Sequence, residues 1–410
     1  MNAETQRWDF ENDKGYKITL ETFREELDDS IKQFDSSTDS SYSFFGRLFA
    51  MEKAYSQPYS QKAKRYNEHI TLAAILHNDT KDLVIGVINI GIKDCVLKDT
   101  QVKAGCIFEW KLHNNFLTIG LGGALFSKAE EIAKSMQVKL LYCLTATTHT
   151  NTIAFYQSQG FTKGTEEFSS LLLNVPKTNG KKKISQDDVV FKKLDTDTTR
   201  KAFSDLSKEH EFHCKNLEEY TKVDEYFGTY QLETKDGKCR AGISIYEDSG
   251  PFRHLTRFLF PVNYYASSLF CAILMGLLSL IPAAVFTKSA VAGIGLELGL
   301  LLVFRKIIEI VKVLGYPNQQ AFATGVFYEG DPSQEASVMN SLTTMLSSTI
   351  HELGKRRLRV LFNKDSKFKK YFRDKYPGSY SILYKPLSED LSKDSDFSAL
   401  ASPLFDFRDV

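Results

Sequence analysis

The stretch Ile119–Phe161, IGLGGALFSKAEEIAKSMQVKLLYCLTATTHTNTIAFYQSQGF, decides the fold that we expect for this chain. Its first part predicts an amphipathic helix over 121–136, because apolar residues recur at helical spacing among charged ones: Leu121, Leu125, Ile132 and Met136. A strand over Val138–Thr145 and a second helix over Thr152–Gln159 follow. Gly160 stands where a glycine commonly ends a helix. The stretch therefore predicts a helix–strand–helix unit.

The residues before this stretch alternate between helical and extended patterns. They predict a helix over Thr22–Phe34 and then strands over His69–Leu76, Leu83–Ile92 and Gly105–Leu112. Strands alternating with helices favour an α/β fold, here with a mixed sheet.

A similar order of elements returns after a Pro-, Gly- and Lys-rich linker at 174–187. The second half predicts strands and helices at these places: Val189–Leu194, Asp197–Glu209, Tyr230–Glu247, Ala323–Tyr328, Ser333–Leu353, Leu358–Phe362 and Ser381–Pro386. We therefore expect one domain over 1–173, a diverged copy over 188–390 and a C-terminal tail over 391–410.

The composition excludes several classes of function. The chain has 410 residues, of which 52 are Lys or Arg and 51 are Asp or Glu, so a formal net charge of +1 provides no basic field for nucleic acid. The 6 cysteines are widely spaced, which fits reduced thiols better than disulfides or a zinc site. His210 and His213 lack partner ligands at metal-site spacing, so we expect no metal and a polar helix end there.

Two sequence patterns in the first half resemble the acetyl-CoA-binding core of the GCN5-related N-acetyltransferase (GNAT) superfamily. One is Gly120-Leu121-Gly122, which opens a helix directly after a strand. The other is N-x-x-A-F-Y-x-x-x-G-F over Asn151–Phe161, after the next strand. The paired patterns, in this order, are a stronger signal than a lone G-x-G.

The resemblance implies that acetyl-CoA binds as a substrate at the turn that opens the first helix. Backbone N–H groups and the helix N-terminus would hold the pyrophosphate. The expected binding residues are Leu117, Thr118, Ile119, Gly120, Leu121, Gly122, Gly123, Asn151 and Tyr156. Leu117 stands where the family has Gln or Arg, so weak cofactor binding, or none, is the alternative.

The resemblance also implies roles for two side chains. Tyr156 matches the family tyrosine that protonates the departing CoA thiolate. Glu109 lies in the preceding strand, alternates against Phe108 and Trp110, and falls where many members place the carboxylate that takes the amine proton. His113 is a weaker alternative base. A core aromatic role for Tyr156 and a solvent-facing Glu109 remain the structural alternatives.

An apolar segment interrupts the second half. Residues 258–287 carry no charge, and the core Tyr264–Phe286 is long enough to cross a bilayer as one helix. A second apolar run, Ser289–Phe304, carries only Glu297. We expect a membrane hairpin over 264–304 with both domains in the cytosol, because basic residues flank it. A pair of buried helices in a cytoplasmic protein is the alternative.

Three further stretches, Leu172–Pro176, Phe322–Gly330 and Ser402–Val410, make the whole chain resemble the plant Hookless-type probable N-acetyltransferases and their animal relatives. Such chains pair an intact domain with a degenerate one. The sequence therefore predicts an acetyl-CoA-dependent N-acetyltransferase whose acceptor is a primary amine, attacking directly in a ternary complex. A GNAT-like binding or scaffold protein that has lost the cofactor is the rival hypothesis. The acceptor, the membrane and the oligomeric state stay undecided.

Overall fold

The computed structural model describes residues 6–31, 34, 49–54, 63, 66, 68–79, 81–174, 189–208, 210–215, 221–222, 225–247, 252–258, 260–261, 320–355, 357–363, 366–372 and 378–394. The chain divides into two units. The larger comprises residues 1–34, 57–249 and 319–410, and the smaller comprises 35–56 and 250–318.

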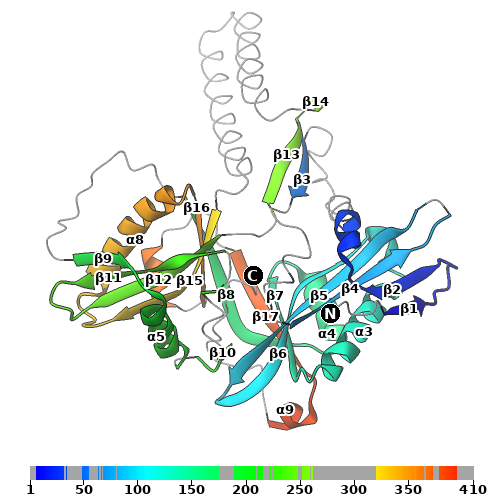
Figure 1. Ribbon diagram of the computed structural model, residues 1–410, viewed down its shortest axis with the longest axis horizontal. Coiled ribbons are helices and arrows are strands. Elements are labelled where there is room, and N and C mark those ends of the chain that lie inside the picture. Colours follow the sequence, from blue (N-terminus) through cyan, green and yellow to red (C-terminus); the bar gives the residue numbers. More distant parts are fainter. Residues whose placement is uncertain are drawn as a thin grey trace, which may run out of the picture. The chain divides into compact units, whose positions relative to one another are not determined.

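The first half of the larger unit supplies strands that flank two helices. Its elements are β1 (Arg7–Phe10), β2 (Ile18–Thr22), η1 (Glu25–Leu27), β4 (Glu68–Leu76), β5 (Leu83–Leu97), β6 (Thr100–Leu112), η2 (Asn114–Phe116), α3 (Leu121–Ser135), β7 (Leu140–Ala146), α4 (Thr150–Ser158) and β8 (Thr162–Asn174). Figure 1 shows α3 and α4 beside these strands.

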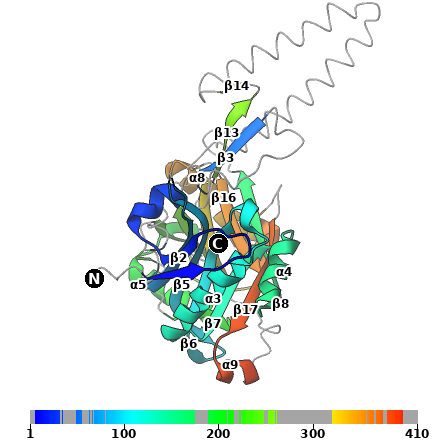
Figure 2. The ribbon, with the colours of Figure 1, turned by 90° about the vertical axis from the view of Figure 1, so that its right-hand side faces the viewer.

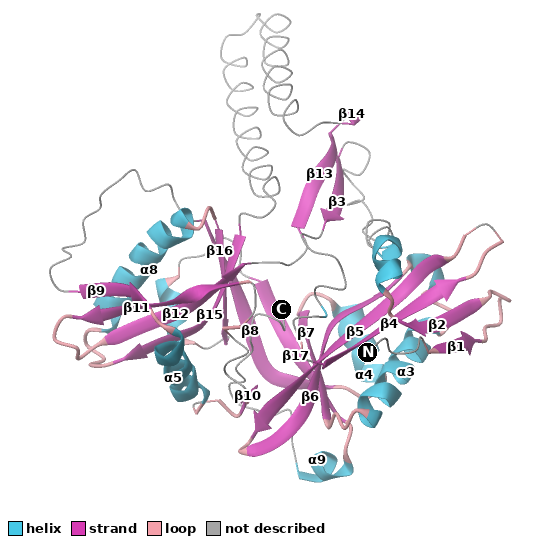
Figure 3. Ribbon diagram, in the orientation of Figure 1, coloured by secondary structure: helices cyan, strands magenta, loops and turns pink. Residues whose placement is uncertain are grey.

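The second half repeats the pattern of strands around a long helix. Its elements are β9 (Val189–Lys193), α5 (Thr196–Ser207), β10 (Phe212–Cys214), β11 (Tyr226–Thr234), β12 (Arg240–Glu247), β15 (Gln320–Glu329), α8 (Glu335–Glu352), β16 (Arg357–Asn363), η4 (Lys367–Tyr371), β17 (Gly378–Pro386) and α9 (Glu389–Asp394). Figure 3 shows how strands dominate both halves.

The two halves share one sheet of 14 strands, in the order β1-β2-β4-β5-β6-β7-β17-β8-β16-β15-β12-β11-β9, with β10 pairing to β5. The centre of this sheet is an exchange of strands. β17, from the end of the second half, lies antiparallel between β7 and β8, and β8, from the first half, pairs with β16. The backbone hydrogen bonds of each half are therefore completed by the other.

Helix α3 covers one face of the first-half strands, as its apolar periodicity predicts. Leu121, Leu125 and Phe126 are buried against sheet residues that include Ile88 and Ile90. The opposite face of β4 and β5 packs against another apolar group: Phe23, Leu27, Ile31 and Phe34. Consecutive residues of β5 therefore point to alternate apolar layers.

The smaller unit contains a three-stranded antiparallel sheet in the order β14-β13-β3. Its strands are β3 (Phe49–Ala54), β13 (Phe252–Phe258) and β14 (Phe260–Pro261). β3 and β13 run side by side in the turned view as well (Figure 2).

The predicted mixed α/β fold is confirmed, and most predicted elements are present within a few residues. Thr22 is an exception, because it ends β2 rather than beginning a helix. The predicted hairpin over 264–304 lies outside the described residues. Among those that are described, no helix has the length and apolarity needed to cross a bilayer. The predicted domain boundaries, linker and tail stay predictions.

Candidate functional site

The parallel strands β6 and β7 separate part-way along their length. They pair from Ala104 with Leu140 to Cys106 with Tyr142. Beyond that point β6 is paired with β5 and β7 with β17. The point at which β6 and β7 separate is called the fork below.

A β-bulge lies immediately beyond the fork. Asn89 pairs with Glu109 and Ile90 pairs with Ile107, so Phe108 is an extra residue on β6. The bulge corrects one expectation: Phe108 and Glu109 do not alternate across the sheet. Phe108 packs in the cluster of Cys106, whereas Trp110 packs in the cluster of α3.

The glycine turn at the start of α3 leaves its backbone accessible. Gly120 is the N-cap residue, has φ of 79°, and has no side-chain hydrogen bond that caps the helix. A Cβ added to Gly120 would meet nothing within 4 Å. Leu117 is 58% exposed and Thr118 is exposed, whereas Ile119 packs against the core. The first N–H groups of α3 therefore point out of the helix with a partial positive charge.

Tyr156 reaches the fork from α4. It is 6% exposed and packs edge-on against Trp110 and Phe161, with ring centroids 5.1 Å away in each pair. Its hydroxyl forms a hydrogen bond with the thiol of Cys143 on β7. Burial, Cys143 and Cys106 raise the pKa of Tyr156 well above its usual value, so the phenol is neutral and carries a proton.

Aromatic side chains line the helix side of β6 beyond the fork. Trp110 lies 4.5 Å from Phe155 and 5.2 Å from Phe126, measured between ring centroids. A Cβ added to Gly122 would meet Phe155 at 3.1 Å. The Nε1 of Trp110 is buried without a hydrogen-bond partner among the described residues. Sequence reasoning assigned Trp110 and Phe155 no role, because aromatics at such positions are usually core.

Glu109 is on the opposite face of β6 from Trp110. Its side chain is only 10% exposed, which excludes the solvent-facing alternative. One carboxylate oxygen is 3.2 Å from the Nζ of Lys111, and the other accepts a hydrogen bond from the Nδ2 of Asn89 at 3.4 Å. Both carboxylate oxygens therefore have a donor, one from Lys111 and one from Asn89.

The remaining predicted residues lie at helix starts. Asn151 is exposed in the first turn of α4, and Gly123 is near Gln159, whose Oε1 would lie 3.9 Å from an added Cβ. His113 caps η2, with its Nδ1 accepting from the N–H of Asn115 at 3.3 Å. The structure therefore uses His113 in a turn.

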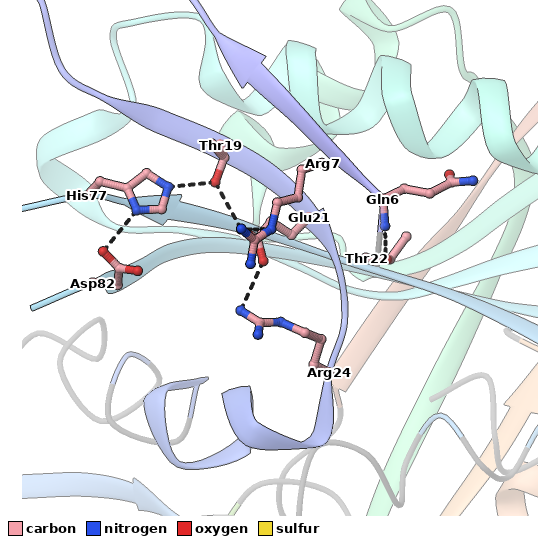
Figure 4. A network of polar contacts seen from close by, with 8 residues as sticks. All are labelled: Gln6, Arg7, Thr19, Glu21, Thr22, Arg24, His77 and Asp82. Carbon is pink, nitrogen blue, oxygen red and sulfur yellow. Dashed lines mark hydrogen bonds and ion pairs between the residues drawn. The ribbon is translucent and has the colours of Figure 1, made fainter. Parts of the chain in front are cut away.

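An ion-pair network joins β1 and β2 to Arg24 and to His77, which directly follows β4 (Figure 4). Glu21 is 1% exposed and lies 2.9 Å from Arg7 and 3.1 Å from Arg24. The hydroxyl of Thr19 connects it to His77 at 2.8 Å, and His77 contacts Asp82 at 2.9 Å. The network fixes the N-terminal strands in the sheet.

The described residues contain no group of three or more His, Cys, Asp or Glu side chains that could hold a metal. His213 belongs to the short strand β10 and contacts the carbonyl of His210 at 3.1 Å. The expectation of a helix end is wrong here, because α5 ends at Ser207 and β10 pairs with β5.

The second half contains a counterpart of the fork. β15 and β16 pair in parallel from Gln320 to Ala323, and β15 carries an extra residue near Gly325, which has φ of 67°. The following helix α8 begins differently from α3. Glu335 in its first turn is 8% exposed and accepts a hydrogen bond from Tyr371 at 2.9 Å. Lys367 and Lys370 lie 2.9 Å and 3.5 Å from the same carboxylate.

Comparisons with known proteins agree with this geometry. Residues 36–161 match the profile of the acetyltransferase (GNAT) family. No curated protein matches the sequence. The fold is similar to N-myristoyltransferase of Saccharomyces cerevisiae with bound myristoyl-CoA, with 8% identity and a TM-score of 0.50 over 98% of this chain and 88% of that one.

Two further solved structures are similar. A glucosamine N-acetyltransferase region in a fungal multi-domain GH3 beta-N-acetylglucosaminidase is 9% identical, with a TM-score of 0.54 over 90% of this chain and 38% of that one. A tandem GNAT protein from the clavulanic acid biosynthesis pathway is 9% identical, with a TM-score of 0.49 over 90% and 99%. Residues 36–161 are therefore similar in sequence to the acetyltransferase (GNAT) family, and the N-myristoyltransferase and glucosamine N-acetyltransferase structures show a likeness of fold.

Proposed function

We propose that the chain transfers an acetyl group from acetyl-CoA to a primary amine. The observation that carries this proposal is the fork: a protonated tyrosine lies at its base, a buried carboxylate follows its bulge, and an open helix start lies at the end of the same strand.

The residues divide the reaction between them. The turn from Leu117 to Gly123 holds the pyrophosphate through backbone N–H groups, with Asn151 beside it. The neutral amine nitrogen attacks the thioester carbonyl, and Glu109 takes one proton from that nitrogen as the carbon–nitrogen bond forms. The carbon–sulfur bond breaks, and Tyr156 gives its proton to the CoA thiolate. Backbone N–H groups near the bulge stabilise the oxyanion.

A direct test combines calorimetry with turnover. Acetyl-CoA should bind to the full chain, and Tyr156→Phe should lower kcat by about tenfold to a hundredfold while the Kd of acetyl-CoA changes less than twofold. Tyr328→Phe is the control, since it also removes one hydroxyl hydrogen bond, to the carbonyl of Asp331. Absence of binding at millimolar acetyl-CoA would defeat the proposal.

A second candidate is a binding protein that keeps the fold without the cofactor. The exposed Leu117, where the family has a basic or amide side chain, favours it. The same calorimetric experiment separates the two candidates.

We further propose that the second half is a degenerate GNAT-like copy, in which Glu335 fills the place of an external anion. Association with a membrane through residues 264–304 is also a proposal, supported by the absence of charged residues from 258–287 and by the apolar run Ser289–Phe304, in which Glu297 is the one charged residue. Pelleting with vesicles tests it, and full recovery in the supernatant would contradict it.

A further inference from the structure

Three polar side chains form a line across neighbouring strands on the face of the sheet that carries Glu109. Thr71 on β4 pairs with Asn89 on β5, and Asn89 pairs with Glu109 on β6. Paired residues on adjacent strands point to the same face, so the three side chains are neighbours. Their strand neighbours Leu72, Ile88 and Trp110 point to the α3 side. We call this line the polar row.

The polar row is buried and incompletely hydrogen-bonded. Asn89 is 0% exposed and Thr71 is 6% exposed. The Oδ1 of Asn89 and the Oγ1 of Thr71 have no hydrogen-bond partner among the residues that the structure describes. Buried polar atoms in folded proteins nearly always find a protein or solvent partner. Two such oxygens side by side therefore indicate a missing donor.

The chemistry of the row selects the kind of donor. The Nδ2 of Asn89 already donates to Glu109 at 3.4 Å, and the reverse amide orientation would set two acceptors against each other. The unpaired atom of Asn89 is thus an acceptor beside a carboxylate. Lys111 contacts the other oxygen of this carboxylate at 3.2 Å. The oxygen beside Asn89 still repels an anion, whereas an ammonium group offers it three N–H donors.

We propose that the polar row is the subsite for the acceptor's amino group, an inference that rests on the proposed function. The amine donates to Asn89 and to Glu109, and Thr71 completes the shell. Asn89 is a positioning residue, because it orients both the amine and the carboxylate that takes the proton. Since Asn89 is fully buried, the group must be slender, as at the end of an unbranched primary amine.

The experiment measures thiol release from acetyl-CoA with n-butylamine as the acceptor. Asn89→Leu should raise the KM for the amine at least tenfold, and Thr71→Val about threefold, which is about 0.6 kcal/mol. The KM for acetyl-CoA should change less than twofold in both. Thr199→Val is the control, because its Oγ1 is also buried without a partner among the described residues, but in α5. Unchanged amine KM in both row variants overturns the proposal.

A binding measurement separates this inference from the proposed function. If acetyl-CoA does not bind, the proposed enzyme fails, and the polar row is then tested by thermal unfolding with n-butylamine. A rise in Tm for the wild type that is lost in Thr71→Val supports the subsite. An equal shift, or none, means that the row holds water only and overturns it. Thr71→Val carries the test alone if Asn89→Leu does not fold.

Discussion

Helices α3 and α8 follow similar strand pairs but treat their free N–H groups in opposite ways. α3 begins at Gly120, with no acidic residue in its first turn and no capping side chain. α8 begins with Glu335, a buried carboxylate bound by Tyr371, Lys367 and Lys370. The start of α3 carries no side-chain anion, whereas the start of α8 has a carboxylate of its own. The comparison teaches that strand geometry alone does not make a cofactor site.

The largest expected effect comes from adding a carboxylate to the open helix start. Gly120→Asp should weaken acetyl-CoA binding about tenfold or more, or about 1.4 kcal/mol, because it repels the pyrophosphate and strains a left-handed backbone. Calorimetry measures the loss. Gly354→Asp is the matched control, with φ of 72° and equally open surroundings. Equal losses in both variants would break the comparison.

The converse change removes the internal anion from α8. Glu335→Ala should lower the free energy of unfolding by about 1–2 kcal/mol, since Tyr371 and the exposed lysines Lys367 and Lys370 lose their acceptor. Urea denaturation with and without sodium sulfate is the measurement. Sulfate should restore more stability to the variant than it adds to the wild type. An equal sulfate effect would show that the vacated site holds no anion.

The loss of folding stability at acid pH is a further test of the role of Glu335 at the start of α8. Burial raises the pKa of Glu335, but hydrogen bonds from Lys367 and Tyr371 and the nearby lysine charges outweigh it, so the pKa lies below its usual value. A lowered folded-state pKa gives stability that is present above about pH 4.5 and is lost as the pH falls through the folded value. Glu335→Gln should therefore show a flatter decline than the wild type. If Glu335→Gln and the wild type lost stability identically as the pH falls, the stabilising role of the Glu335 carboxylate would be contradicted.

The smallest effect is a gain. Leu117→Arg places a cation beside the open helix start and should tighten acetyl-CoA binding about threefold, in line with an exposed ion pair of up to about 1 kcal/mol. Calorimetry at two salt concentrations should show the gain shrinking as salt rises. Val190→Arg, at another exposed apolar position, is the control and should have no effect.

Local sequence patterns predicted the helices and strands. Which strands pair with one another depends on contacts between residues far apart in the sequence. The periodicity of α3 and the glycine turn were visible because neighbours in sequence carry them. The strand exchange was not, because β17 pairs with β7 across more than 230 residues and neither strand has a local signature for its partner. The bulge at Phe108 inserts one residue without a Gly or Pro signal, so the predicted alternation of Phe108 was wrong.

For the candidate site, too, local patterns predicted individual residues but not the contacts between distant ones. Tyr156 was identified by its resemblance, but its contact with Cys143 depends on where α4 crosses β7. The polar row needed three strands in register, and Thr71 and Asn89 are separated in sequence from Glu109 by hairpins whose exact length sets that register.

The strand exchange has a consequence for synthesis on the ribosome. Strands β7 and β8 have been synthesised once the ribosome reaches Asn174. Strand β17, which pairs with both, begins only at Gly378. At ordinary translation rates the intervening residues take roughly 10–40 s to emerge. Until β16 and β17 emerge, the edges of β7 and β8 that pair with them are unsatisfied, so we expect a dependence on chaperones that hold extended segments.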